Sequence, residues 1–258
     1  MKKIFTFTIL FLFSVTLFAQ DNKGSDLKNF RFGGTILPSL FWYKPDNLKK
    51  FASNGAVAKF GVLINGEYSF SGNFAFGFGL GLASAGGKIT FTDTANYYFN
   101  DDAIISLADT TGLKGKYEYY KLNNRAYNAS YFIIPLSLKM RTNEIGYMRY
   151  FFQPSINIGF RKKIRANDDL CSYKTKQPLQ QTDLDITKDM NFFRLSTTMS
   201  AGGEYYLSGS TAVVFAIGYD YGLSNVTKDS KYLIRTDSKP VEQKFIQHGV
   251  VLTLGILF

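Results

Sequence analysis

The chain offers one histidine, His248, and one cysteine, Cys171, for nucleophilic or metal chemistry. A histidine base must lie within about 3 Å of its nucleophile and be held by an orienting group. Gln247 and Gly249 flank His248 and supply no nucleophile, so we expect a structural histidine. A single cysteine excludes an intramolecular disulfide and a cysteine-rich zinc site, which leaves Cys171 as a free thiol or a link to another chain.

The acidic pairs Asp101-Asp102 and Asp168-Asp169 are further groups able to bind a cation. Neither pair has the spaced oxygen ligands of a calcium loop, so we interpret both as solvated loop charge. The glycine-rich run 74–83 has a period of two residues and lacks the following helix of a nucleotide-binding loop. The sequence therefore predicts no catalytic residue, no metal site and no cofactor.

The segment 1–19 has the layout of a secretory signal peptide. Basic residues open it, an apolar stretch follows over 4–18, and Ala19 is a small residue at the expected cleavage point. No later stretch approaches the run of about 20 apolar residues that a membrane-spanning helix needs. We expect a cleaved export signal at 1–19 and a lead segment at 20–29. Export also excludes nucleic acid as a partner for the formal charge of +10.

Apolar and polar residues alternate with a period of two along much of the remaining chain, which is typical of strands with two different faces. The clearest run places Phe74, Phe76 and Phe78 on one face and small residues on the other. Each run is long enough for the roughly 9–11 residues of a tilted membrane strand. Eight such strands are predicted, at 30–42, 58–70, 74–83, 131–141, 148–161, 193–205, 212–221 and 246–258.

The connections between these strands alternate in length. The short turns lie at 71–72, 142–146 and 208–209, and the long polar loops at 44–56, 91–127, 162–190 and 225–243. With an even number of strands, the short turns share one end and the long loops share the other. Short periplasmic turns and long extracellular loops are typical of outer-membrane barrels. The sequence thus predicts an all-β, eight-stranded, antiparallel, up-and-down transmembrane β-barrel over 30–258.

Three prolines, Pro38, Pro135 and Pro154, lie inside the predicted strands. In a closed barrel every strand is paired on both sides, so a proline without a backbone N–H leaves a hydrogen bond of the ladder unmade. We therefore expect a β-bulge or a strand end at each of them.

The position of the apolar face separates a membrane barrel from a lipocalin-like periplasmic barrel, which turns that face inward around an apolar ligand. Aromatic residues gather at both ends of the apolar face, as expected where a barrel meets two lipid interfaces. They are Phe30, Tyr68, Phe70, Phe74, Tyr150, Tyr205 and Phe258 near the short turns, and Trp42 and Tyr221 near the long loops. We favour the membrane barrel and keep the lipocalin-like barrel as an alternative.

The face opposite the apolar one carries charges that a narrow eight-stranded barrel has to accommodate among its interior side chains. Counting along the strands places four of them near the short turns: Glu67, Lys139, Arg149 and Glu204. We expect these four to form a paired network inside the barrel, with no open water channel.

A basic cluster lies at the opposite rim, where the fifth predicted strand ends. Its members are Arg161, Lys162, Lys163 and Arg165. Phosphates of lipopolysaccharide lie at this height, and basic side chains would neutralise them. An ordinary solvated rim is the competing interpretation.

Three segments carry a resemblance to a known family. The run Tyr-Phe-Ile-Ile-Pro-Leu-Ser-Leu-Lys at 131–139 resembles a strand of the PorT-like outer-membrane β-barrel proteins of the Bacteroidetes. Gly-Gly-Glu-Tyr-Tyr-Leu at 202–207 and Tyr-Asp-Tyr-Gly-Leu-Ser-Asn-Val at 219–226 are similar to two later strands of that family. The resemblance implies a small barrel of the OmpX or OmpA type. Independently of it, the terminal Phe258 closes an alternating strand and looks like the signal read by the outer-membrane assembly machinery. The resemblance leaves the function open, because a fold does not fix an activity.

Two functions from different classes remain. The first is a non-enzymatic surface barrel, a secretion-associated component among them, whose long loops contact a protein partner. Loop 91–127 is the main candidate, because tyrosines make good contact surfaces, and it holds Tyr97, Tyr98, Tyr117, Tyr119 and Tyr120. The second is a barrel enzyme acting on lipid A or another outer-leaflet lipid, with His248 as its base.

Overall fold

A computed structural model of the protein describes residues 29–100, 103–104, 119–228 and 241–258. The predicted signal peptide 1–19 and nearly all of the lead segment lie outside these residues, as do Asp101, Asp102 and Tyr117. The strands are β1 Phe30–Ile36, β2 Ser39–Pro45, β3 Phe51–Ser53, β4 Val57–Lys59, β5 Gly61–Ser69, β6 Phe74–Asn100, β7 Ala103–Ile104, β8 Tyr119–Arg141, β9 Met148–Ser172, β10 Pro178–Asp185, β11 Phe193–Ser208, β12 Thr211–Gly222 and β13 Phe245–Leu257. A short 3-10 helix, η2, covers Thr187–Asp189.

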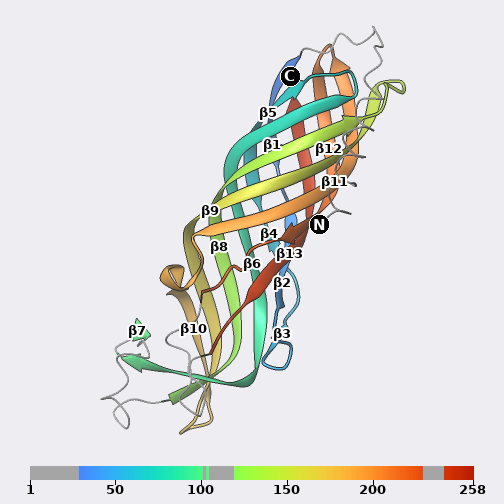
Figure 1. Ribbon diagram of the computed structural model, residues 1–258. Helices are drawn as coiled ribbons and strands as arrows, with labels where there is room; N and C mark the ends of the chain where they lie inside the picture. The colour runs from blue at the N-terminus through green and yellow to red at the C-terminus, as the bar shows by residue number, and fades with distance from the viewer. Residues whose placement is uncertain (1–28, 101–102, 105–118, 229–240) are drawn as a thin grey trace, which may run out of the picture.

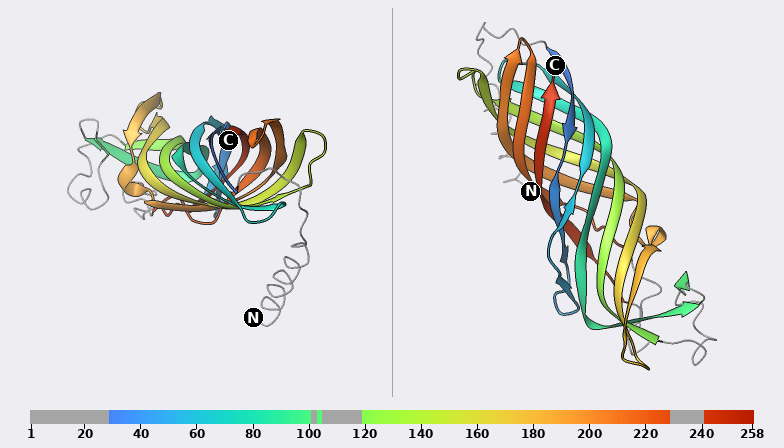
Figure 2. Two further views of the ribbon diagram at one scale, coloured as in Figure 1. Left: turned by 90° about the horizontal axis from the view of Figure 1, so that it is seen from above. Right: turned by 180° about the vertical axis from the view of Figure 1, so that it is seen from behind.

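The strands pair with their sequence neighbours and close into a ring of eight (Figures 1 and 2). β1 and β2 together form one strand of the ring, and β4 and β5 form the next. Antiparallel pairing of β1 with β13 closes the ring, with Gly33 opposite Leu257. Backbone hydrogen bonds link Phe32 and Phe258 in both directions, at 3.0 and 2.8 Å. The predicted fold, an eight-stranded antiparallel barrel, is confirmed.

The apolar face of the alternating pattern points outward. Ile64 and Leu80, near the middle of the wall, have 73% and 54% of their surface exposed on the outside of the barrel. The opposite face carries the charges and is turned inward, where Arg31 and Glu204 are fully buried. A lipocalin-like barrel requires the reverse arrangement, so that alternative is excluded. An outward apolar band is what a bilayer requires of a barrel wall.

We call the end with the short turns, which is at the top of Figure 1, the lower end of the barrel. Above the apolar band, toward the bottom of Figure 1, three strands continue far beyond it. β6, β8 and β9 have 27, 23 and 25 residues, more than twice the roughly 9–11 residues that span a membrane. On β6 the outward residues are apolar up to Leu82, whereas above Ser84 the apolar residues Ala85, Ile89 and Phe91 are buried inside. The strand thus reverses which face is apolar, because water replaces lipid on its outer side.

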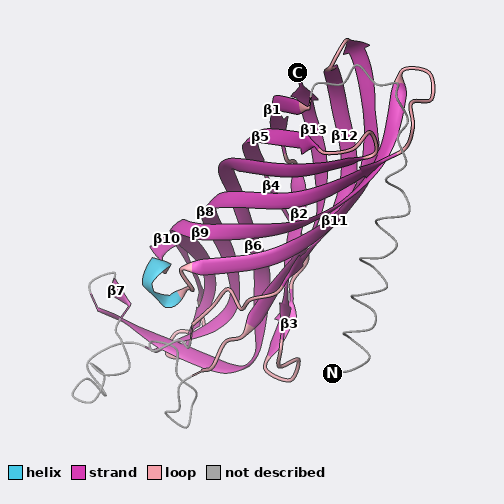
Figure 3. Ribbon diagram, turned by 45° about the horizontal axis from the view of Figure 1, so that its top comes forward, coloured by secondary structure: helices cyan, strands magenta, loops and turns pink. Residues whose placement is uncertain are grey.

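The extended strands correct two loop predictions. Most of 91–127 and 162–190 is strand, and β10 pairs with the upper part of β9 to lengthen the sheet (Figure 3). Tyr97 and Tyr98 pair in register with Tyr120 and Tyr119, so these four lie on strands rather than in a loop. Outside the bilayer the outer face is polar and the period-two signal weakens, which is why the sequence pattern ended these strands too early.

The three prolines are accommodated in different ways. Pro38 lies in the break between β1 and β2, at a strand end as expected. Pro135 and Pro154 lie within β8 and β9, and no register shift occurs at either of them. The expected bulges are therefore absent there. Instead, the β6–β8 ladder is interrupted. Phe78 and Gly81 are paired with β8, but the two β6 residues between them are not, because Pro135 on the opposite strand has no N–H to donate.

No helix in the described part of the chain is long and apolar enough to cross a membrane.

Candidate functional site

A charge cluster fills the barrel interior near the short turns. Its members, from four strands, are Arg31, Glu67, Lys139, Arg141 and Glu204. Arg31 Nη2 lies 2.6 Å from Glu67 Oε1 and 2.9 Å from Glu204 Oε2. Lys139 Nζ bridges the same two carboxylates at 2.5 and 2.7 Å. Arg141 Nη2 contacts Glu67, and its Nε lies 3.9 Å from Glu204 Oε1.

This arrangement brings together three of the four residues predicted for the lumen, namely Glu67, Lys139 and Glu204. The fourth, Arg149, is buried but turns away from the cluster. Its guanidinium donates to Glu144 Oε2 at 3.3 Å and to the Gly72 carbonyl at 3.4 Å. Arg149 therefore ties two short turns together rather than neutralising Glu204, although the two residues are opposite each other in the β9–β11 register.

Sequence reasoning missed two members of the charge cluster, Arg31 and Arg141, and it also missed Tyr206, which is hydrogen-bonded to the cluster. The Tyr206 hydroxyl donates to Glu204 Oε2 at 2.8 Å and accepts from Arg31 Nη1 at 3.2 Å. Strand periodicity does place Arg31 and Arg141 on the inner face. Their contacts with Glu204 cross the lumen between strands that are not neighbours, however, and no local pattern records such contacts.

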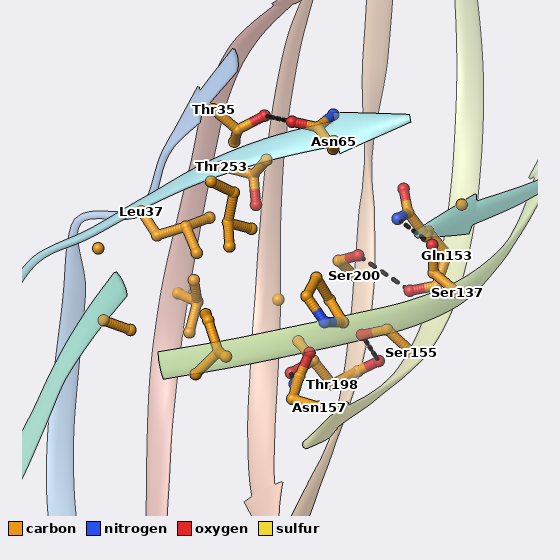
Figure 4. Close-up of a pocket in the computed structure, with 18 of the residues that line it drawn as sticks. Thr35, Leu37, Asn65, Ser137, Gln153, Ser155, Asn157, Thr198, Ser200 and Thr253 are labelled. Atoms are coloured by element: carbon orange, nitrogen blue, oxygen red, sulfur yellow. Dashed lines mark hydrogen bonds between the residues drawn. The ribbon is translucent and has the colours of Figure 1, made fainter. Parts of the chain in front are cut away.

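A small cavity of about 150 Å³ borders the charge cluster at Glu67 and Lys139. Figure 4 shows part of its lining. Apolar side chains, Leu63, Ile133 and Phe151 among them, line it together with polar side chains that hydrogen-bond to one another across neighbouring strands. Thr35 donates to Asn65 at 2.8 Å, and Gln153 donates to Ser137 at 2.9 Å. Drug-sized ligand pockets usually start at about 300 Å³, whereas a cavity of about 150 Å³ holds a few waters or one group about the size of benzene.

A second ion pair lies above the cavity. Arg194 Nη2 lies 2.5 Å from Asp220 Oδ1, and the Ser196 hydroxyl donates to Asp220 Oδ2 at 2.8 Å. The Arg194 guanidinium carbon also lies 5.8 and 5.9 Å from the ring centroids of Phe41 and Tyr131, within cation–π range. Buried ion pairs thus lie at both ends of the cavity.

The extended strands enclose an apolar core above this upper pair. We use the name platform for residues 85–96, 120–129 and 163–186, which form this part of β6, β8, β9 and β10. Its buried residues pack in one cluster with Tyr43 of β2, Phe51 of β3 and Phe245 of β13, and they include Ile89, Phe91, Leu122, Tyr127, Ile164, Leu170 and Ile186. The platform therefore has a packed apolar interior, and the same cluster continues down to Tyr131 and Ile133 inside the barrel.

One charged pair is buried inside the platform. Arg125 Nε and Nη2 lie 2.6 and 2.5 Å from the two carboxylate oxygens of Asp168, and both residues are 1% exposed. The interpretation of Asp168 as solvated loop charge is thus wrong. The adjacent Asp169 is exposed, as expected. At the surface, the Thr187 hydroxyl and backbone N–H, hydrogen-bonded to the Asp185 carboxylate, hold the pKa of Asp185 below its usual value.

The structure divides the predicted basic rim. Arg161 points inward, where its guanidinium donates to the carbonyls of Thr187 and Met190. Lys162 occupies a bulge in β9 opposite the Ser130–Tyr131 step of β8. Lys163 is exposed, and Arg165 Nη1 lies 2.8 Å from Asp183 Oδ2. The four residues therefore do not form a single cationic patch.

His248 lies on the outward face, near the upper edge of the apolar band. The Tyr219 hydroxyl lies 3.0 Å from His248 Nδ1. The Trp42 ring is stacked on the imidazole with 6.5 Å between ring centroids, and the Tyr221 ring meets it edge-on with 4.8 Å between centroids. Cys171 is half-buried at the upper end of β9, with its thiol 3.8 Å from the Ser172 carbonyl. Among the described residues, no three His, Cys, Asp or Glu side chains are placed to share a metal ion.

Solved structures with a similar architecture come from several bacteria. Neisserial surface protein A has 9% identity and a TM-score of 0.40, covering 89% of this chain and 97% of its own. OprG of Pseudomonas aeruginosa has 10% identity and a TM-score of 0.39, covering 92% and 99%. The Escherichia coli outer membrane protease OmpT has 9% identity and a TM-score of 0.34, covering 92% and 99%. No curated protein matches the sequence.

Residues 18–228 match the family model described as the outer membrane protein β-barrel domain. This match covers most of the chain, and it agrees with the ring of eight strands and its outward apolar band. The predicted location in the outer membrane is therefore confirmed. The chain belongs to the outer membrane protein β-barrel domain family.

Proposed function

We propose that the protein is a non-enzymatic outer-membrane barrel that binds a protein partner through its extracellular platform. The observation that carries this proposal is the continuation of β6, β8 and β9 beyond the apolar band as a packed body. A spanning segment alone needs neither the extra strand length nor an apolar interior beyond the membrane. Packing of that interior orders the platform, and an ordered surface binds a partner at a smaller entropic cost than flexible loops do.

The interior of the barrel supports a role outside the membrane. The cavity of about 150 Å³ is small, and its Ser, Thr, Asn and Gln side chains are hydrogen-bonded to one another. Fully buried charges fill the lumen below it. A barrel so packed serves as a scaffold.

The tip of the β9–β10 hairpin offers a contact surface of suitable chemistry. Tyr173 and Leu179 are 39% and 38% exposed, next to the exposed Lys174 and Lys176. Lys176 Nζ lies 5.2 Å from the centroid of the Tyr173 ring, which keeps both side chains at the surface of the hairpin. Tyrosine supplies a large, amphipathic contact area at a small cost in conformational entropy. The PorT-like motifs make a secretion component one candidate partner.

The surroundings of His248 favour an anchoring role over a catalytic one. Its described neighbours are the aromatic rings of Trp42, Tyr219 and Tyr221, at the upper edge of the apolar band. Aromatic side chains gather at this level in membrane barrels, because one end is apolar and the other is polar. We therefore propose that His248 belongs to the outer aromatic girdle.

Site-specific photo-crosslinking in living cells tests the partner. A photoreactive amino acid at position 179, in place of Leu179 on the platform, is expected to give a discrete protein adduct. The same amino acid at position 207, in place of Leu207, is the matched control, because Leu207 is also an exposed leucine but lies at the short-turn end. The adduct should disappear when the gene for the captured protein is deleted. The same adduct at both positions, or none at 179, contradicts the proposal.

A further inference from the structure

A surface pocket of about 570 Å³ lies outside the barrel where β4, β6, β8 and β9 approach one another. It occupies the upper end of the seam between the β4–β5 strand and β6, above the pairing of Gly61 with Ala83. Its polar lining comprises Lys59, Ser84, Asn128, Ser130, Lys163, Arg165 and, from β10, Asp183. None of these groups belongs to the charge cluster inside the barrel.

Positive charge dominates the pocket, which has three cations and one carboxylate. Lys59 reaches across the seam to donate to the Asn128 side-chain oxygen. Gly86 leaves room for the lysine, because a β-carbon at this position would lie only 3.1 Å from Lys59 Cε. Arg165 is paired with Asp183, whose side chain is 73% exposed. Lys163 has no ion-pair partner among the residues that the structure describes. Lysine and arginine have three and five N–H donors, so all three cations retain donors for an anion.

The height of the pocket follows from the reversal of the apolar face. Phe60, at its lower edge, is 51% exposed, and Leu82 and Phe132 beside it are 50% and 39% exposed on the lipid side. One outward step above them, Ser84 and Ser130 pair with each other across β6 and β8. The pocket therefore lies where acyl chains give way to headgroups, with an apolar lower edge and a cationic wall.

We infer that this pocket binds a phosphate group of an outer-leaflet lipid. Lys59 and Lys163 would contact the phosphate oxygens, the serine hydroxyls would donate to them, and Phe60 would pack against the first part of an acyl chain. Hydrogen bonds between ammonium groups and phosphate are roughly twice as strong as neutral ones. The pocket differs from the predicted basic cluster at 161–165. It includes Lys59, which is distant in sequence, and it does not include Arg161 or Lys162.

Lipid retention by the purified full-length barrel tests the assignment. The double variant Lys59→Gln and Lys163→Gln should retain about tenfold less bisphosphorylated lipid A than the wild type, measured by mass spectrometry after extraction from vesicles. The double variant Lys44→Gln and Lys244→Gln is the matched control, because it removes two exposed lysines that do not line the pocket. It should retain the wild-type amount. Lysine-to-arginine variants at 59 and 163 should also bind, and an unchanged heat-modifiable band verifies folding of each variant.

Two further probes identify the source of the phosphate. Dephosphorylated lipid A should be retained poorly by wild type and variants alike, and inorganic phosphate should compete only weakly, because it lacks the acyl chain that meets Phe60. Equal loss of lipid from both glutamine double variants would show bulk charge attraction and overturn the assignment. Inorganic phosphate that binds as tightly as the lipid would overturn it as well.

Discussion

Replacing Glu204 with alanine is expected to lower the stability of the barrel by about 3–5 kcal/mol, because it removes one partner of a buried ionic group. In the charge cluster, Glu204 and Glu67 together face Arg31, Lys139 and Arg141. Without Glu204, three buried cations share one carboxylate, and the Tyr206 hydroxyl loses the acceptor 2.8 Å away. The temperature at which the folded band shifts on an SDS gel should fall markedly, and the urea midpoint should fall with it.

Glu144→Ala is the control for this prediction. Glu144 also pairs with a buried arginine, Arg149, but its side chain is 47% exposed and lies in a short turn. Exposed pairs contribute at most about 1 kcal/mol, so this variant should stay close to the wild type. Equal shifts in the two variants, or no shift for Glu204→Ala, would show that the cluster does not stabilise the barrel.

Asp168→Ala should open the platform while leaving the membrane barrel folded. Arg125 then loses the carboxylate that meets it at 2.5 and 2.6 Å in a buried site, a change that typically costs about 3–5 kcal/mol. The loss is expected to be local, because the pair is embedded in the core above the apolar band. Trypsin added to intact cells should cleave the platform at Lys121 and Lys163 more than about tenfold faster, since cleavage follows the population of the open state.

The neighbouring Asp169→Ala variant provides the comparison. Asp169 is exposed and accepts only long hydrogen bonds, 3.4 Å from Asn124 and 3.2 Å from Gln180. Its proteolysis should match that of the wild type within about twofold, as for most surface substitutions. If Asp168→Ala lowers the gel-shift temperature as far as Glu204→Ala, then platform and barrel form one cooperative unit and the separation proposed here is wrong.

The membrane-embedded part of the fold could be predicted from the sequence because lipid imposes a strict rule on it. Every second residue faces hydrocarbon, so runs such as 74–82 repeat with a period of two and reveal both strand and face. The platform could not be read in this way. Above Ser84 the apolar residues move to the inner face, and Ala85, Ile89 and Phe91 break the earlier phase. That phase reversal is itself a usable signal for the membrane boundary.

The charge cluster was only partly predictable for a geometric reason. Periodicity gives the face of each residue, and counting from the turns gives its approximate height. The face and the height of a residue do not determine its partner across the lumen, because barrel strands are staggered and each long side chain can adopt several rotamers. Glu67 and Arg31 are direct neighbours in the β1–β5 register, yet Glu204 also reaches Arg31 from a strand that does not adjoin β1.

In the orientation proposed for this barrel, the platform stands outside the cell and the short turns face the periplasm. Labelling of single cysteines with a membrane-impermeant maleimide tests this orientation most directly, in a Cys171→Ser background. Thr175→Cys, at the exposed β9–β10 turn, should be labelled on intact cells. Ser208→Cys, at the exposed end of β11 beside a short turn, should be labelled only after the outer membrane is opened. Labelling of position 208 but not 175 on intact cells would contradict the account.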